Sequence, residues 1–479
     1  MLQLLLGGSG SGKTTLLYQR IRARAEKGEK SILLVPEQFT SSTEGRIYRE
    51  LGDALSGMVE SFSFTSLAEK ILSTEGGAAV QTLSDAGRAV LVRRALEELQ
   101  DNVHYYHRHR RSAAFCQMAA QTIDELKSAG LSGRQLAQLA GACGAESGKL
   151  SELALIFQGY ETLLARSGMD PSDRLELAGA RLEEALARHS LPEFLRDRAV
   201  FIDEFDTFNA PKKRLLGAML AALPSVTVAL CDDGAPLLPG DLSLFSGAKQ
   251  VAAQLRQLAR KNGAEVAVPQ LLRKDLRHRN APGLAAVAEL LETGSCTADA
   301  PADEVRLFAA PSREEEARAA AGAIRRLMRQ GVRCGKIAVV CRDIAKYRAA
   351  VRYEFRMAEI PLYCDEPSTP EFSAPATAVR ALLEIARGAD LTENLTTLAK
   401  TGLCALSEEQ VCALENYAYT WAPTAAAWRE KFERSPKGFG EQELTEEDLR
   451  NRERAEYARA LLVGAVDAFL SLIHISEPT

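Results

Sequence analysis

The sequence has no apolar run of the roughly 20 residues that a membrane-spanning helix needs. It also lacks low-complexity tracts and repeats of solenoid period. Its apolar start, residues 1–6, is far shorter than the hydrophobic region of a signal peptide and has no basic flank. The 9 cysteines are scattered without a CxxC pair. We therefore expect reduced thiols in a cytoplasmic protein rather than disulfides or a zinc site.

Positive charge is also scarce. Lysine and arginine number 59 against 64 aspartate and glutamate, a net charge of −5, so no overall positive field attracts a polyanion. A nucleic acid would have to bind a local patch or groove. The composition, 46% hydrophobic and 26% charged, excludes disordered, collagen-like and disulfide-scaffold classes. The 479 residues suffice for about three domains at roughly 150 residues each.

What the sequence does contain is an alternation of apolar strands and helices. We predict strands at residues 2–6, 31–35 and 59–64, with a helix from Lys13. From about 82 to 190 an alanine- and leucine-rich helical periodicity takes over, and strands return at 199–202 and 225–231, with a helix over 213–223 between them. This pattern predicts an α/β domain with a parallel sheet, interrupted by a helical insertion.

A second α/β unit is predicted after a polar, small-residue stretch that we interpret as an interdomain linker. Its strands are expected at 305–308 and 337–340, and Ser312 with Glu315 forms a capping box at the start of the helix between them. Helices dominate again after about residue 375.

A phosphate-binding loop follows the first strand. Its residues match G-x-x-x-x-G-K-[ST] and are Gly7, Gly8, Ser9, Gly10, Ser11, Gly12, Lys13, Thr14 and Thr15. Glycines let backbone N–H groups turn toward phosphate oxygens, and the start of the next helix adds partial positive charge. We expect the loop to bind ATP, with Lys13 on the β- and γ-phosphates and the Thr14 hydroxyl on Mg²⁺.

An acidic pair ends the apolar strand 199–202. Asp203 is predicted to hold Mg²⁺, and Glu204 to position or deprotonate the attacking water. The alternative is a strand that ends in a solvated acidic turn. The phosphate-binding loop favours the functional interpretation.

Residues 104–111 form a basic and aromatic patch, with three of the 6 histidines. Its arginines are Arg108, Arg110 and Arg111. Contacts to a DNA backbone or stacked bases are one interpretation, and a solvated loop or helix face is the other. Zinc is not favoured, because no suitably spaced thiol or carboxylate joins the histidines.

Four further segments, together with the early phosphate-binding loop, carry a resemblance to a known family. They are VPEQFT at 35–40, SFSFTSLA at 61–68, KTGL at 400–403 and LENY at 414–417. The succession resembles the AddB family, the B subunits of the bacterial ATP-dependent helicase/deoxyribonuclease AddAB, over residues 1–470.

The resemblance implies a superfamily-one helicase-like α/β fold, with RecA-like P-loop domains that have parallel sheets and are interrupted by all-helical insertions. Domain 1A would then span 1–78 and 195–280, helical insertion 1B 79–194, a linker 281–303, the start of domain 2A 304–388 and part of helical domain 2B 389–470. Residues 471–479 resemble a translated sequencing-adapter tail, so we expect a longer natural protein.

The resemblance also implies site residues. It assigns single-stranded DNA contacts to Gln38, Phe39, Thr40, Ser63 and Phe64. Phe39 and Phe64 offer stacking surfaces, unless they pack in the core. Arg348 falls on the arginine that related helicases present to the γ-phosphate.

The implied partners are an AddA-like helicase/nuclease subunit and double- and single-stranded DNA, with double-strand ends processed for recombinational repair and a Chi sequence recognised. The family's nuclease site and four-cysteine iron–sulfur cluster belong to a later region, so their ligands are not expected among these residues.

Some features depart from an active motor. Asp206 stands where motor helicases have glutamine. The segment Asp232-Asp233-Gly234, which follows the predicted strand 225–231, lacks the sensor glutamine of an active motor. Two alternatives therefore stay open: a stand-alone P-loop NTPase that uses Glu204 as base, and a non-catalytic DNA-scanning module with a structural ATP site.

Overall fold

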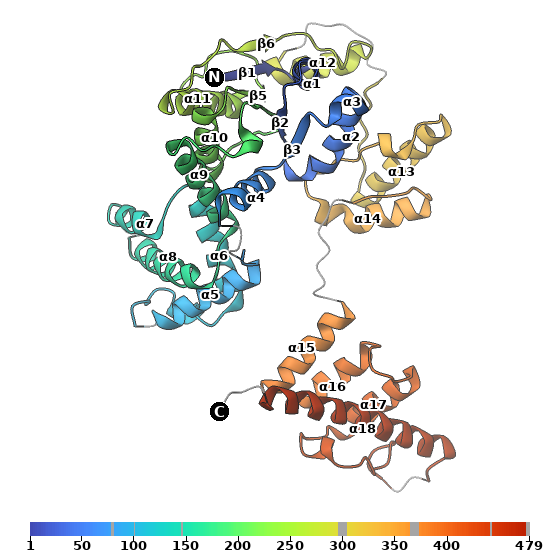
Figure 1. Cartoon of the computed structure of the whole chain (residues 1–479). Helices are drawn as coiled ribbons and strands as arrows, with labels where there is room; N and C mark the ends of the chain where they lie inside the picture. Colours follow the sequence, from blue (N-terminus) through green and yellow to red (C-terminus); the bar gives the residue numbers. More distant parts are fainter. Residues whose placement is uncertain are drawn as a thin grey trace. The chain divides into compact units, whose positions relative to one another are not determined.

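The computed structural model describes residues 1–77, 81–99, 101–144, 147–295, 304–364, 373–440 and 443–475. The chain divides into two compact units, residues 1–307 and 308–479, which are described separately. Figure 1 labels their helices and strands. No helix in the described ranges is long and apolar enough to cross a bilayer.

A parallel sheet organises the first unit. Its strands are β1 (Leu2–Gly7), β2 (Ser31–Leu34), β3 (Val59–Phe62), β4 (Ala199–Ile202), β5 (Ser225–Cys231) and β6 (Gln270–Leu272). Their spatial order is β3-β2-β4-β5-β1-β6, and the pairing between each two neighbours is parallel. Because all carboxyl ends of parallel strands share one edge, the loop after β1 and the acidic pair after β4 lie on the same edge, with β5 between them.

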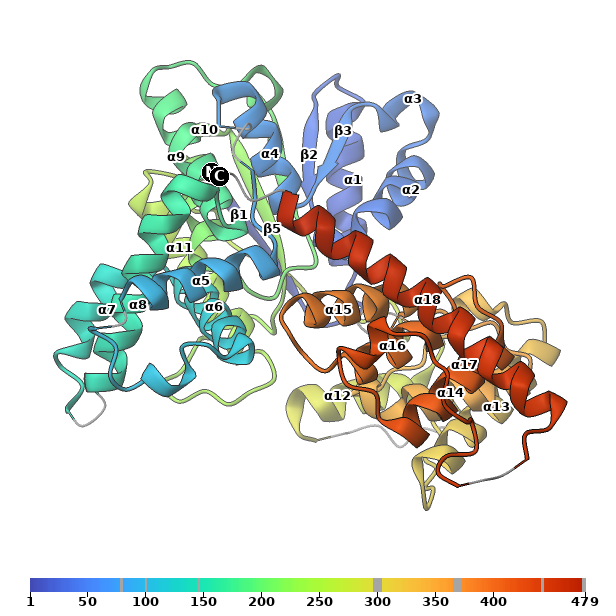
Figure 2. The same ribbon diagram turned by 90° about the horizontal axis from the view of Figure 1, so that it is seen from below.

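Helices cover both faces of this sheet (Figure 2). The helices described in the first unit, not all of which touch the sheet, are α1 (Lys13–Ala25), α2 (Thr40–Leu51), α3 (Asp53–Ser56), α4 (Phe64–Glu75), α5 (Asp85–Glu98), α6 (Ala113–Ser128), α7 (Gly133–Ala140), α8 (Ser147–Ser167), α9 (Pro171–Ala187), α10 (Ala210–Ala222), α11 (Ser246–Lys261) and α12 (Pro282–Thr293). Leu4 and Leu6 pack in one core with α4, α9, α10 and α11, whereas Leu5 packs in another with α1 and α2. The central strands β2, β4 and β5 are mostly apolar because both faces of the sheet are covered.

The helical stretch has a separate core, as its periodicity predicts. Helices α5, α6 and α8 bury Leu96, Ile123 and Phe157 together. Helix α9 instead packs against the core of the sheet through Leu175, Ala178 and Leu182.

The first unit differs from the sequence predictions in several places. β3 ends at Phe62, two residues early, because Ser63 caps α4: its hydroxyl accepts from the Ser66 backbone. β6 was not predicted. The interdomain linker was expected over 281–303, but α12 occupies most of its first half. Residues 296–303 lie outside the described ranges.

The second unit has helices but no strand among its described residues. They are α13 (Arg313–Arg329), α14 (Ile344–Met357), α15 (Ala374–Ala386), α16 (Leu391–Lys400), α17 (Glu408–Trp421) and α18 (Glu446–Ile475). The Ser312 side chain caps α13 by accepting from the Glu315 backbone, which is one half of the predicted capping box; the Glu315 side chain instead accepts from Arg318. The predicted strands at 305–308 and 337–340 are wrong: both segments lack a pairing partner within the described ranges. Helices α15–α18 share a core around the fully buried Trp428.

Candidate phosphate-binding site

The loop between β1 and α1 has the backbone that its glycines permit. Gly10 and Gly12 have φ of +78° and +88°, a left-handed conformation that side chains disfavour. A Cβ on Gly10 would lie 2.7 Å from Arg277 Cβ, so a larger residue does not fit. Lys13 Nζ donates to the carbonyls of Gly7 and Gly8, both at 2.8 Å, and is thereby held over the loop.

The acidic pair after β4 faces this loop. The Thr14 hydroxyl hydrogen-bonds the carboxylate of Asp203, whose residue is only 6% exposed. Burial raises the pKa of Asp203, whereas the bond from Thr14 opposes that shift. A hydroxyl and a buried carboxylate are both oxygen donors, so this pair fits Mg²⁺.

Glu204 has an unusual backbone. Its φ is +65°, which costs a non-glycine residue about 1–2 kcal/mol. Its N–H donates to Asp203 Oδ1 at 3.0 Å. Burial raises the pKa of Glu204, and the neighbouring Asp203 charge raises it further. Strained residues of this kind concentrate at functional sites.

A hollow of about 510 Å³ joins these groups at the carboxyl edge of the sheet. Lys13, Thr14, Asp203 and Glu204 line it, together with other residues of the loop. The structure thus brings together most of the residues predicted to bind phosphate, Mg²⁺ and the attacking water, whereas Gly7, Gly8 and the buried Ser11 do not line the hollow. Their ligand contacts stay predictions.

Two arginines that sequence reasoning missed also line the hollow. Arg277 Nη1 donates to Ser9 Oγ at 3.2 Å, next to a backbone bond from Leu276 to the Gly10 carbonyl. For Arg277 the sequence does contain a signal: the basic run 273–279 ahead of Pro282 marks a candidate anion-binding segment. Arg46 comes from α2, and no local motif marks it.

The segment predicted to contact single-stranded DNA divides into an exposed and a buried part. Gln38 and Phe39 are exposed in a short 3₁₀ turn, η1 (Glu37–Phe39), and Thr40 begins α2 half-exposed. Phe64, by contrast, is 2% exposed and packs edge-on against Phe205, with ring centres 5.2 Å apart. Of the two interpretations of Phe64, core packing is therefore the one that the structure supports, because its ring is buried among other aromatic rings.

The side chain of Ser63 is likewise engaged within the protein. Its hydroxyl caps α4, and the residue is 4% exposed. This placement disfavours the DNA contact that the resemblance implies for Ser63, since the hydroxyl already serves the helix start.

The basic patch 104–111 is held in place by Glu152. The backbone N–H groups of His104, Tyr105 and Tyr106 donate to the Glu152 carboxylate at 2.7–3.2 Å. Within the patch, Arg108 and Arg111 are exposed and Arg110 is half-exposed. The geometry is compatible with DNA contact, which stays a prediction.

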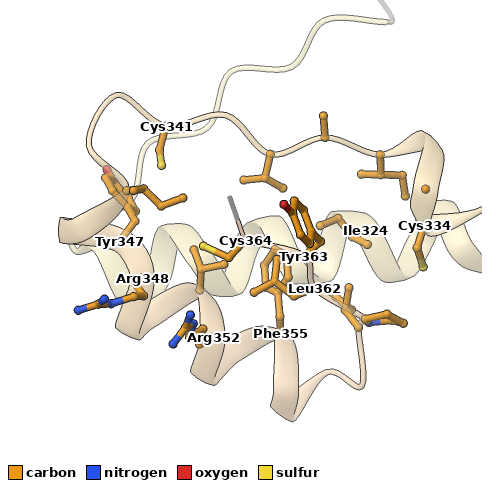
Figure 3. A pocket seen from close by; sticks show the side chains of 18 residues that line it. Ile324, Cys334, Cys341, Tyr347, Arg348, Arg352, Phe355, Leu362, Tyr363 and Cys364 are labelled. Atoms are coloured by element: carbon orange, nitrogen blue, oxygen red, sulfur yellow. The ribbon is translucent and has the colours of Figure 1, made fainter. Parts of the chain in front are cut away.

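Arg348 belongs to the second unit. It lies on α14 at a mostly apolar hollow of about 680 Å³, which α13, α14 and the segments around Cys341 and Leu362 line (Figure 3). Its predicted role at the γ-phosphate stays a prediction.

A comparison with protein families shows which family the chain belongs to. The family model described as "ADDB, N-terminal" matches residues 4–288, more than half of the chain. The chain belongs to the AddB family. This confirms the resemblance that the sequence motifs indicated.

Curated AddB relatives match over most of the chain. The chain is 32% identical to the B subunit of the ATP-dependent helicase/deoxyribonuclease of Desulforudis audaxviator, covering 89% of this chain and 37% of that protein. For the same subunit of Symbiobacterium thermophilum the values are 31%, 95% and 41%, and for that of Clostridium perfringens 27%, 98% and 41%. The chain therefore spans about two-fifths of the length of these AddB relatives.

Proposed function

We propose that this chain is the ATP- and DNA-binding part of one subunit, the AddB-type subunit, of a heterodimeric ATP-dependent helicase/nuclease. It would act with an AddA-type subunit on double-strand DNA ends in recombinational repair. The observation that carries the proposal is the convergence of Lys13, Thr14 and Asp203 in one hollow at the carboxyl edge of a parallel sheet. The names of the AddB relatives support the wider assignment.

Each residue of the site would contact a different part of the Mg²⁺–ATP complex. Lys13 would exchange the carbonyls of Gly7 and Gly8 for the β- and γ-phosphates. The first N–H groups of α1 lack intrahelical partners and would donate to phosphate oxygens. Thr14 and Asp203 would hold Mg²⁺, which neutralises phosphate charge when bound. Glu204 would orient the attacking water and accept its proton.

Nucleotide titration tests the site. We expect Lys13→Ala to weaken binding of Mg²⁺–ATP by about tenfold or more, because a charge-assisted contact is lost. Lys27→Ala, a change of an exposed lysine just after α1, is the matched control and should bind ATP as the wild type does. Unchanged ATP affinity in Lys13→Ala, with an unaltered melting curve, would refute the assignment.

ATP hydrolysis distinguishes two alternatives for this site: a motor hydrolyses ATP, whereas a structural site only binds it. Asp206 lines the hollow where motor helicases carry glutamine, which favours a site that binds without efficient turnover. Turnover by the chain without partner or DNA, abolished by Glu204→Gln, would indicate a stand-alone NTPase. No turnover even with an AddA-type subunit and DNA would indicate a structural site.

DNA binding would use the exposed turn at Gln38, Phe39 and Thr40 and the patch at Arg108, Arg110 and Arg111. We expect replacement of the three arginines by alanine to lower single-stranded DNA affinity and to make its salt dependence shallower, since fewer counterions are released. Equal affinity and slope would exclude the patch. Chi recognition, the nuclease and the iron–sulfur cluster are proposals for the full-length protein.

A further inference from the structure

Arg46 lies in the hollow without belonging to any predicted motif. It comes from α2, whose buried residues Thr43, Ile47 and Leu51 fix the helix beside α1. The guanidinium carbon lies 4.9 Å from the centre of the Tyr18 ring on α1. In the part of the chain that the structure describes, no ion pair within 4.0 Å engages Arg46. Helix packing and a cation–π contact therefore place this charge.

Arg46 shares the hollow with the acidic pair. Asp203, Glu204 and the guanidinium-bearing Arg46 all line it. Burial raises the pKa of Tyr18 to about 12, and Arg46 opposes the shift. The guanidinium thus belongs to the same local cluster as the residues predicted to bind Mg²⁺ and water.

The strand order places Arg46 on a particular side of this cluster. The loop follows β1, Asp203 follows β4, and α2 follows β2, which lies beyond β4 from the loop. A chain of phosphates that starts at the loop and reaches Asp203 therefore ends on the side from which Arg46 approaches. Lys13 reaches the same hollow from the start of α1, which follows β1.

We propose that Arg46 binds the terminal phosphate of a nucleoside triphosphate and so distinguishes it from a diphosphate. The inference rests on the proposed nucleotide site and adds a contact that its sequence motifs do not contain. A guanidinium held by an aromatic face keeps its N–H groups available, and these suit two phosphate oxygens at once. A diphosphate held by the loop has no group at this position.

Paired titrations with a non-hydrolysable ATP analogue and with ADP, both with Mg²⁺, test the proposal on the intact chain. Arg46→Gln keeps most of the side-chain length and removes the charge. We expect it to weaken binding of the analogue by about 10- to 100-fold, the loss of a charged hydrogen bond, and ADP binding by less than about twofold. Arg46→Lys, which keeps the charge without the planar fork, should recover part of the loss.

Arg49→Ala is the matched control. Arg49 is an exposed residue on the same helix, and its Nε donates to the Gly45 carbonyl, so this variant should bind both nucleotides as the wild type does. Melting curves of all nucleotide-free variants establish that they fold. If Arg46→Gln loses its melting transition, the comparison of the two nucleotides in Arg46→Lys decides, and equal effects on both overturn the proposal.

The outcomes distinguish a failure of the nucleotide site from a failure of the Arg46 contact alone. Wild type that binds neither nucleotide, or Lys13→Ala that binds both normally, would overturn the nucleotide site itself. If Lys13→Ala loses both nucleotides while Arg46→Gln binds the analogue normally, the site stands and the role of Arg46 is wrong. Equal losses of analogue and ADP in Arg46→Gln would also overturn it, because a terminal-phosphate contact affects only the triphosphate.

Discussion

Two regions of the sequence have strand patterns, but only the first of them forms strands among the residues that the structure describes. Strand β1 pairs with β5 on one side and β6 on the other, and Leu4 and Leu5 are fully buried. The equally apolar segment 337–340 pairs with nothing in the described ranges, and Val340 is 91% exposed. Both segments lie beside amphipathic helices. An apolar strand pattern is therefore not sufficient for a strand: it becomes one only where partner strands from elsewhere in the chain complete the hydrogen bonds.

The largest effect that this comparison predicts comes from one charge placed in each region. Val228 on β5 is fully buried, so Val228→Asp places an unpaired carboxylate in the core and should cost more than about 4 kcal/mol. We expect loss of the cooperative unfolding of the first unit and, with it, of ATP binding. Val340→Asp changes an exposed residue and should alter stability by less than about 0.5 kcal/mol.

Denaturant unfolding and nucleotide titration of both variants measure the contrast. If Val340→Asp unfolds the chain as severely as Val228→Asp does, then the segment 337–340 is buried in solution, and the two regions are alike after all.

The same contrast explains how much of the fold the sequence predicts. Strands β1, β2, β4 and β5 and helix α1 follow from local patterns, because each is a continuous apolar run or an amphipathic period next to a glycine or proline signal. β6 has three half-buried residues, too few for a pattern, and exists because β1 offers a free edge. α12 carries proline at its start and Gly294 at its end, signals that the polar composition around it obscured.

The candidate site divides in the same way. The loop and the acidic pair could be predicted, since each has a motif within a few residues. Arg46 could not, because no local motif marks it and its place depends on the order of strands. The basic run at 273–279 marks Arg277 as a candidate, but its place in the hollow depends on the path of the chain across the sheet edge. Phe64 shows the converse: a motif suggested an exposed ring, but the Ser63 cap turns the chain into α4 and directs the ring into the core.

A smaller effect comes from two glycines with the same backbone. Gly12 and Gly331 have φ of +88° and +87°, so alanine at either position should cost about 1–2 kcal/mol of conformational strain. Only Gly12 has a neighbour: a Cβ there would lie 3.0 Å from Leu276 Cδ1, whereas Gly331 has open space. We expect both variants to lose similar stability in denaturant unfolding but only Gly12→Ala to lose ATP affinity. Loss of ATP affinity in Gly331→Ala would contradict this separation.

The smallest effect concerns two serine caps. Ser63 starts α4 with a reciprocal capping box and is buried, whereas Ser312 starts α13 at the exposed surface. Loss of a serine cap costs about 0.5–2 kcal/mol of stability. We expect Ser63→Ala to lie near the upper end of this range, because it leaves the N–H of the half-buried Ser66 without its acceptor. We expect Ser312→Ala to lie near the lower end, because that cap is exposed. Thermal unfolding measures both. If Ser63→Ala keeps full stability but weakens single-stranded DNA binding, the hydroxyl serves DNA rather than the helix, and the motif-based assignment of Ser63 would be restored.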